Sequence, residues 1–577
     1  MVFIDLGGIL ADDGSLEPVI DRIINYLIPK PHPPLTIVAP RMVPRKLRRE
    51  ADDIGYCGVK SLSHETARRL VKSLLKAQDL YATDAEVESL TELGEGHPYN
   101  YYRMVGEIKE KSISVFLSTV NQFVEWKHRK SSEYVKRLKL SDDEIAVVSA
   151  LNLIPQADFE ALAASLHMVP EALGMALEKL IYDHVVEFSI DLYKISPALR
   201  VAVERDRRFT LSKAARAEIL GTIAKTLTVR IEEGTAAVQL VDAAVLAEIE
   251  TAAGVSAFAQ ALVLPSHYVW LARRSYDRQD FQESIRLARI GLEGKGRLSR
   301  NGKVAACRYL CPSAARLGDD AAFAEGIAIL KADSGASWTR SNIEFLLGFN
   351  ERLKGNLPQA EDHLREALAF STDNFSAARE LASVCAARGN LDDAEAFARE
   401  AQQQAPDNAY VLDILISVLI RRHGRSVKHS TEIEGLFQSL EKVGDEGGRS
   451  FYTTRRAEFE HLWGDNREAL RLIDVAVRKT PRIFDVHRLR ARILLKDGNK
   501  GEAWKKISKL KEIIDSHSTS ERRANYRGYV EVLAEYLEAT GRYKEAKELF
   551  RDDAAFTKAE RDNKIKEIEI SESYSRA

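Results

Sequence analysis

Residues 341–374 (SNIEFLLGFNERLKGNLPQAEDHLREALAFSTDN) and residues 375–408 (FSAARELASVCAARGNLDDAEAFAREAQQQAPDN) align over 34 positions without a gap. The two segments share a pattern of small residues and a Gly-Asn pair. Small residues let two antiparallel helices approach closely, and the Gly-Asn pair stands where the first helix must stop and turn. Each segment therefore predicts one hairpin of two helices. The small residues are Gly348, Ala360 and Ala367 in the first segment, and Ala382, Ala394 and Ala401 in the second.

A gapless period of 34 residues resembles the tetratricopeptide repeat, in which each repeat is a helical hairpin. One hairpin cannot bury its own apolar face, so copies must stack. Extending the frame predicts an array of about eight hairpins over residues 265–560, with a charged tail at 561–577. The frame fits poorly at 304–332 and loses its turn at 421–425. Such a stack implies a concave surface that binds a protein or peptide ligand.

Composition describes an ordinary globular chain: 577 residues, 45% hydrophobic and 29% charged, with a net charge of −2. This charge creates no bulk field that would attract nucleic acid or an anionic membrane. No apolar run reaches the roughly 18 residues that a membrane helix needs, and the N-terminus lacks the basic region of a signal peptide. Four scattered cysteines form no disulfide framework. We therefore expect a cytoplasmic protein with no membrane partner.

Residues 1–115 read as part of an open α/β sheet. An unbroken apolar strand at 2–4 ends in Asp5, an amphipathic helix covers 17–27, and a second buried strand at 35–38 ends near Arg41. Ligands of such sheets bind at the carboxyl ends of the strands. Two plainer interpretations remain open: Asp5 caps a turn, and Arg41 is a solvated loop residue.

The order of these segments resembles the STAND class (signal-transduction ATPases with numerous domains), which includes the NB-ARC proteins. Asp5 is similar to a Walker B aspartate, Arg41 to the sensor segment that follows it, and Gly96-His97-Pro98 to the base-contacting loop. The resemblance implies that Asp5, Arg41, His97 and Pro98 contact ATP or ADP with Mg. His97 and Pro98 also fit ordinary helix-start chemistry, since proline suits a first helical turn.

The chain departs from the STAND pattern because no G-x-x-x-x-G-K-[ST] motif occurs in it. Without that phosphate cradle and its lysine, neither tight ATP binding nor hydrolysis is expected. We therefore predict no enzyme activity and no cofactor for this chain alone. ATP or ADP with Mg becomes possible only if an upstream or partner segment supplies the P-loop. The alternative is a head that has decayed into a scaffold.

Residues 116–208 are predicted to be a helical segment followed by a winged helix. Short helices at 144–151, 157–166 and 170–184 precede two β-type runs at 185–189 and 192–195. In the STAND class this fold follows the ATPase directly. The third helix offers Glu171, Glu178 and Lys179, a poor set for reading DNA, so nucleic-acid binding is not expected. Residues 209–264 read as a helical connector.

The fold class is thus mostly α: a partial α/β P-loop-type domain, a winged helix and an α-solenoid. Buried thiols are expected at Cys307 and Cys311, and core packing at the tryptophans of the array. We find no catalytic constellation. Non-consensus residues on the first helix of each pair are candidate ligand contacts, although a solvated face explains each equally well. These residues are Asn350, Arg379, Asp413, Arg456, Arg488 and Arg490.

Two hypotheses follow. In the first, the chain is the regulatory and sensor portion of a STAND-type protein: the repeats bind a protein trigger, and the winged helix and ATPase remnant relay that event to an effector or to a P-loop half. In the second, the chain is a non-enzymatic repeat scaffold for protein–protein interaction. A third and weaker hypothesis is a transcription regulator that uses the winged helix.

Overall fold

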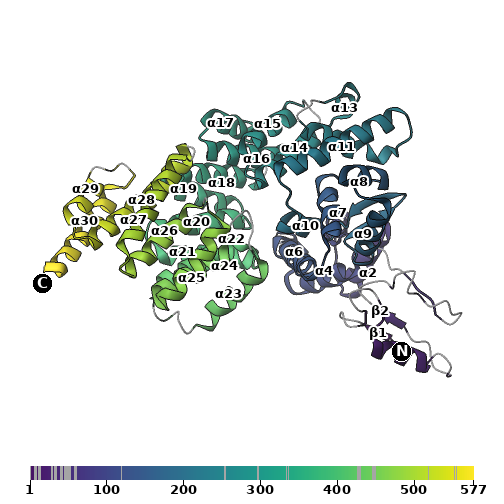
Figure 1. Cartoon of the computed structure of the whole chain (residues 1–577), viewed down its shortest axis with the longest axis horizontal. Coiled ribbons are helices and arrows are strands. Elements are labelled where there is room, and N and C mark those ends of the chain that lie inside the picture. The colour runs from purple at the N-terminus through teal and green to yellow at the C-terminus, as the bar shows by residue number, and fades with distance from the viewer. Residues whose placement is uncertain are drawn as a thin grey trace. The chain divides into compact units, whose positions relative to one another are not determined.

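The computed structural model is predominantly helical and divides into two compact units, residues 1–263 and 264–577 (Figure 1). It describes residues 2–4, 9–10, 15–27, 30, 36–38, 43, 48, 54–57, 61–118, 120–251, 255–294, 298–332, 334–335, 337–424, 426, 430–444, 450–481, 483–516, 519–551, 553 and 555–576. Among these residues, no helix is both long enough and apolar enough to span a membrane.

The chain begins with a parallel pair of short strands. Strand β1 (Val2–Ile4) pairs with β2 (Thr36–Val38) in the register Val2 to Thr36, and helix α1 (Pro18–Leu27) lies between them in sequence. The strand, helix, strand order matches the sequence prediction. The two residues predicted at the strand ends, Asp5 and Arg41, lie outside the described residues.

Five helices share the next core: α2 (His64–Ala77), α3 (Asp84–Gly94), α4 (Pro98–Lys111), α5 (Ile113–Ser118) and α6 (Val120–Arg137). Ser63 caps α2, because its side chain accepts a hydrogen bond from the N–H of Thr66. Helix α3, which we did not predict, starts at a capping box in which Thr83 and Glu86 exchange hydrogen bonds. Leu90, Tyr101 and other apolar side chains of these helices form one buried cluster.

A second core joins three helices to a hairpin. Helices α7 (Asp142–Leu153), α8 (Phe159–Leu166) and α9 (Pro170–Tyr182) precede the antiparallel strands β3 (Val186–Ser189) and β4 (Leu192–Ile195). The elements after them are α10 (Arg200–Arg205), 3-10 turns at Arg207–Phe209 and Val238–Leu240, α11 (Lys213–Glu232), α12 (Val241–Glu250) and α13 (Ala257–Leu262). Leu220 and Ala244 of α11 and α12 belong to the same cluster as Leu151 and Leu177. The expected boundary near residue 209 therefore does not divide this core.

The second unit is a stack of helical hairpins. The first helices are α14 (Pro265–Asp277), α16 (Arg300–Leu317), α18 (Ser337–Lys354), α20 (Phe375–Ala387), α22 (Ala409–Arg422), α24 (Phe451–Trp463), α26 (Phe484–Lys496) and α28 (Thr519–Ala539). The second helices are α15 (Phe281–Glu293), α17 (Asp320–Lys331), α19 (Leu357–Phe370), α21 (Leu391–Gln404), α23 (Thr431–Val443), α25 (Asn466–Lys479), α27 (Lys500–Ser516) and α29 (Tyr543–Arg551). A last helix, α30 (Lys558–Arg576), packs on α29.

Small residues bring the paired helices together as the sequence predicted. A Cβ added at Gly348 would lie 2.7 Å from Cγ of Leu364 on the facing helix, closer than carbon atoms approach. Ala360, Ala382 and Ala394 are fully buried. At the turns, Gly355 and Gly389 have φ of +84° and +82°, a conformation that glycine adopts without strain. The irregular segment near 304–332 still builds a hairpin, because α16 and α17 bury apolar faces in the same stack, and α22 and α23 likewise pack as a pair.

Some predictions about the array need correction. Trp338 and Trp504 were expected in the core, but each is 44% exposed. The charged segment after residue 560 was expected either to fray or to cap the stack, and it caps the stack as α30, because Ile568 is buried against Phe550 and Phe556. Cys307 and Cys311 are buried thiols, as predicted, and burial raises the pKa of Cys307 to about 12.

Candidate functional site

The first helices of the hairpins line one side of the stack. Each first helix contacts the first helix of the next hairpin, from α14 with α16 to α26 with α28. Among the described helices, successive second helices show no comparable packing. In a curved stack the more closely spaced row lies on the inner side. Helix α28 also packs against α16 and α18, so the curvature returns the eighth hairpin to the second and third.

A buried carboxylate joins three of these first helices. Glu380 of α20 accepts a hydrogen bond from Arg379 at 2.6 Å and forms an ion pair with Arg352 of α18, whose Nε lies 2.7 Å away. Burial alone would raise the pKa of Glu380, but Arg352, Arg379 and Arg316 outweigh burial and hold the pKa at about 2. The carboxylate therefore stays ionised and links α20 to α18.

A second buried carboxylate repeats this arrangement two hairpins further on. Glu458 of α24 pairs with Arg421 at 3.1 Å and with Arg455 at 2.5 Å, and Arg455 also binds Asp413 of α22 at 2.6 Å. Burial would raise the pKa of Glu458, but the two arginines hold the pKa at about 2. Arg455 is likewise kept charged, because its carboxylate partners outweigh its burial and raise its pKa.

These pairs belong to a set that we call the ionic ladder: Arg352, Arg379, Glu380, Asp413, Arg421, Arg455, Glu458 and Arg492. Arg492 of α26 extends it to Glu535 of α28, 2.6 Å away. Removing one member of a buried, satisfied pair leaves the other charge uncompensated, so the ladder holds successive hairpins in register. Sequence analysis missed it because most partners lie 28 to 43 residues apart.

The predicted ligand contacts of the array are engaged within the chain. Arg379 belongs to the ladder and lies over the Tyr410 ring, and Asp413 binds Arg455. Arg456 pairs with Glu434 and Glu460, Arg488 with Asp485, and Arg490 with Asp474. Asn350 is only 5% exposed. The structure places all six on first helices, but a ligand that used these side chains would have to compete with their present partners.

In the first unit, the predicted loop Gly96-His97-Pro98 is a tight turn between α3 and α4. The N–H of Gly96 donates to the Tyr101 hydroxyl (2.8 Å), and its carbonyl accepts from the N–H of Leu62 (2.8 Å). His97 is the N-cap of α4 without a side-chain cap bond, and Pro98 occupies its first turn. These contacts account for the turn by helix-start chemistry alone, and contact of His97 or Pro98 with a nucleotide stays a prediction.

The comparisons with known proteins bear on the repeats. Residues 352–415 match the tetratricopeptide repeat family. The match starts near the end of α18 and ends within α22, so it overlaps most of the segment 341–408 from which the period was read. The array is therefore a tetratricopeptide-type stack at its centre. No curated protein sequence matches the chain.

Solved structures with a related fold include repeat proteins of several kinds. A tetratricopeptide repeat protein from Parabacteroides merdae is 17% identical, with a TM-score of 0.30, over 50% of this chain and 99% of that one. Yeast Tom70 is 14% identical, with a TM-score of 0.31, over 88% and 96%. A STAND protein with a tetratricopeptide repeat sensor from Pyrococcus horikoshii is 13% identical, with a TM-score of 0.26, over 94% and 76%. Similarities this weak carry no functional argument.

Proposed function

We propose that residues 264–577 bind a protein or peptide ligand on the side of the stack lined by the first helices. The observation that carries the proposal is the stack itself: eight hairpins whose first helices form a continuous row, with the tetratricopeptide match at its centre. A continuous helical surface of this kind can accommodate an extended or helical segment along several repeats.

The electrostatics of this side support a ligand with both polar and apolar contacts. Arg379 and Asp413 are 21% and 17% exposed, so part of each side chain faces solvent although its charge is paired. Paired arginines offer further N–H donors to a ligand, since a guanidinium has five. Aromatic rings such as Tyr410 stand beside them.

The test uses the full chain as bait for a random-peptide phage library. We expect enriched peptides to lose about tenfold in affinity for an Arg488→Glu variant, because the change reverses a charge on the inner side. The matched control is Arg471→Glu on the second helix α25, whose exposed side chain pairs with Glu468. Equal binding by all three proteins, with circular dichroism showing intact helices, would overturn the proposal.

We further propose that the first unit relays ligand binding, as the regulatory portion of a STAND-type protein. The order of its parts supports this: a parallel strand pair, a helical segment, three helices with a hairpin, and then the repeats. The alternative is a scaffold whose head has no nucleotide role. Intact-mass measurement of the protein from its own host, combined with nucleotide titration, separates the two.

A longer native protein with a P-loop and saturable ATP binding would support the relay. A protein of this length that shows no nucleotide binding, even with any chain that co-purifies, would support the scaffold. Nucleic acid is a poor fit to the hairpin region, because Lys179 is already paired with Glu144 and Asp183. Met175 of α9 and Phe188 and Ile190 of the hairpin are exposed and apolar. Salt-dependent binding in a gel shift would be needed to favour DNA.

A further inference from the structure

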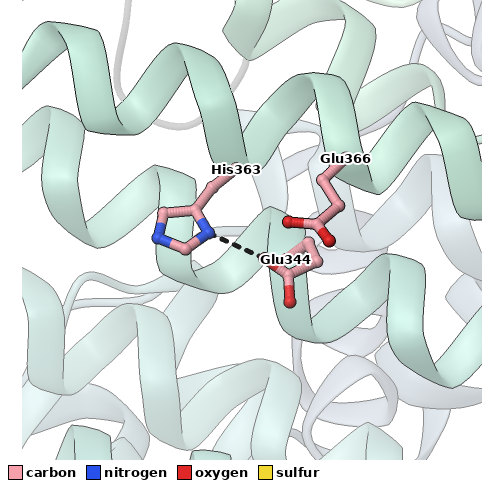
Figure 2. A group of neighbouring side chains, drawn as sticks. All are labelled: Glu344, His363 and Glu366. Atoms are coloured by element: carbon pink, nitrogen blue, oxygen red, sulfur yellow. Dashed lines mark hydrogen bonds and ion pairs between the residues drawn. The ribbon is translucent and has the colours of Figure 1, made fainter.

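Three side chains with metal-ligand chemistry meet between the two helices of the third hairpin. Glu344 projects from α18, and His363 and Glu366 project from α19 one turn apart, so all three converge on the same space (Figure 2). His363 Nδ1 lies 2.7 Å from a carboxylate oxygen of Glu344. One ligand atom from each residue lies within 4.8 Å of the other two.

This group differs from the other such group in the described part of the array. Glu361, Cys385 and Asp393 also converge, but Arg365 lies 2.8 Å from Glu361 and 2.6 Å from Asp393 and so neutralises both carboxylates. Burial raises the pKa of the Cys385 thiol to about 11, and a protonated thiol is a weak ligand. That group is thus already satisfied by a guanidinium.

By contrast, no lysine or arginine of the described chain pairs with Glu344, His363 or Glu366. Two carboxylates and one imidazole therefore face one another with only the His363–Glu344 contact between them. The Glu344 and His363 side chains are 17% and 34% exposed, and Glu366 is exposed, so an ion could enter from solvent.

We propose that Glu344, His363 and Glu366 bind a divalent transition-metal ion, with zinc as the expected metal, between α18 and α19. Imidazole nitrogens and carboxylate oxygens both bind zinc, and an open zinc site has three protein ligands and leaves a fourth position to water or to another ligand. Because the three ligand atoms all lie within 4.8 Å of one another, a point exists that is no more than about 2.8 Å from each. Small movements of exposed side chains bring that distance to the roughly 2.1 Å of a zinc bond.

The bound ion would tie the first helix of the hairpin to the second at the centre of the array. Its open position would face solvent and could accept a carboxylate or imidazole from a bound protein. The softer imidazole ligand favours zinc or cobalt over magnesium or calcium, which prefer oxygen donors alone.

The experiment titrates the full chain, stripped with chelator, with Co²⁺ and then Zn²⁺. We expect one equivalent of Co²⁺ with visible absorption of a nitrogen- and oxygen-ligated ion, displaced by Zn²⁺, and a rise in the Tm of the array with Zn²⁺. His363→Ala and Glu344→Gln should lose this equivalent. Glu344→Gln keeps a polar group beside His363, so its helices should stay intact in the absence of metal.

The matched control is Asp393→Asn in the group already satisfied by Arg365, which should bind Co²⁺ as the unchanged protein does. The same stoichiometry and affinity in His363→Ala as in the unchanged protein would overturn the proposal, since the ion would then sit elsewhere. Binding only at millimolar metal would overturn it as well. If His363→Ala loses both metal binding and helical circular dichroism, metal binding by the Glu344→Gln variant provides the test.

Discussion

The two units of the chain are stabilised differently. In residues 135–247 one apolar cluster joins helices that are far apart in sequence, such as α7 with α11 and α12. In the second unit the apolar contacts break into several small clusters, each confined to neighbouring hairpins. Arginines and carboxylates of the ionic ladder connect the third hairpin to the fourth, the fifth to the sixth and the seventh to the eighth.

The difference follows from geometry. A globular core surrounds each side chain with several elements, so volume and apolarity specify the packing. In a stack each hairpin packs mainly on the hairpin before it and the one after it, so fewer elements surround each side chain and fix the position of neighbouring helices. Directional ion pairs such as Glu380 with Arg352 and Glu458 with Arg421 resist sliding of these helices.

Acid should therefore affect the second unit more than the first, and this is the largest effect we expect. Glu380, Glu395 and Glu458 have pKa values of about 2 in place of 4.5. A lowered folded-state pKa means that the unfolded chain binds more protons, so the stabilisation is present above pH 4.5 and is lost as the pH falls towards 2. Hydrogen exchange at pH 7, 4 and 3 measures each unit within the full chain.

Among the described carboxylates of the first unit, those with a lowered pKa are Asp84 and Glu86, and both are exposed. Their protonation should change stability little. Equal loss of protection in both units between pH 7 and 3 would contradict the comparison.

Glu458→Gln should destabilise the second unit by about 3 kcal/mol, because it removes a buried carboxylate that exposed Arg421 and partly buried Arg455 share. Urea unfolding followed by helical circular dichroism, with hydrogen exchange to assign the unit, measures the change. Glu468→Gln is the control: its carboxylate pairs with Arg471 on the surface, so no measurable change is expected. A Glu458→Gln protein as stable as the unchanged one would mean that apolar packing alone holds the stack.

Gly348→Val should cost about 1 to 3 kcal/mol, since its side chain would overlap Leu364 across the hairpin. Gly435→Ala in α23 has no atom within 4 Å of the added Cβ, so it should stabilise the second unit by up to about 1 kcal/mol through helix propensity. The same unfolding experiment measures both variants. If the two variants change the stability in the same direction, Gly348 is not needed for the close approach of α18 and α19.

Local patterns predicted much of the fold. The hairpin turns at Gly355 and Gly389 depend on residues a few positions apart, so the sequence reveals them. Helix α30 was harder to predict because its charged composition hides a single buried apolar face around Ile568. The exposed Trp338 and Trp504 were assigned to the core because composition does not tell which side of a helix faces the stack.

The candidate site residues also divide into those that the sequence predicted and those that only the structure revealed. Sequence selected first-helix residues such as Arg379 and Asp413 as ligand contacts, and only the structure showed their partners within the chain. It did not find the group of Glu344, His363 and Glu366, because Glu344 belongs to a different helix, 19 residues before His363. The assignment of Asp5 and Arg41 as nucleotide contacts rests on the resemblance to the STAND class alone.

By itself, the sequence determined the period, the hairpin and the turn of this protein, because each depends on side chains a few residues or one repeat apart. The tertiary structure decided which charges are buried together, how α28 returns to α16 and α18, and which ligating side chains meet. The physical reason is that small rotations between successive hairpins add up along the stack. Contacts between distant residues depend on that sum, which no local pattern records.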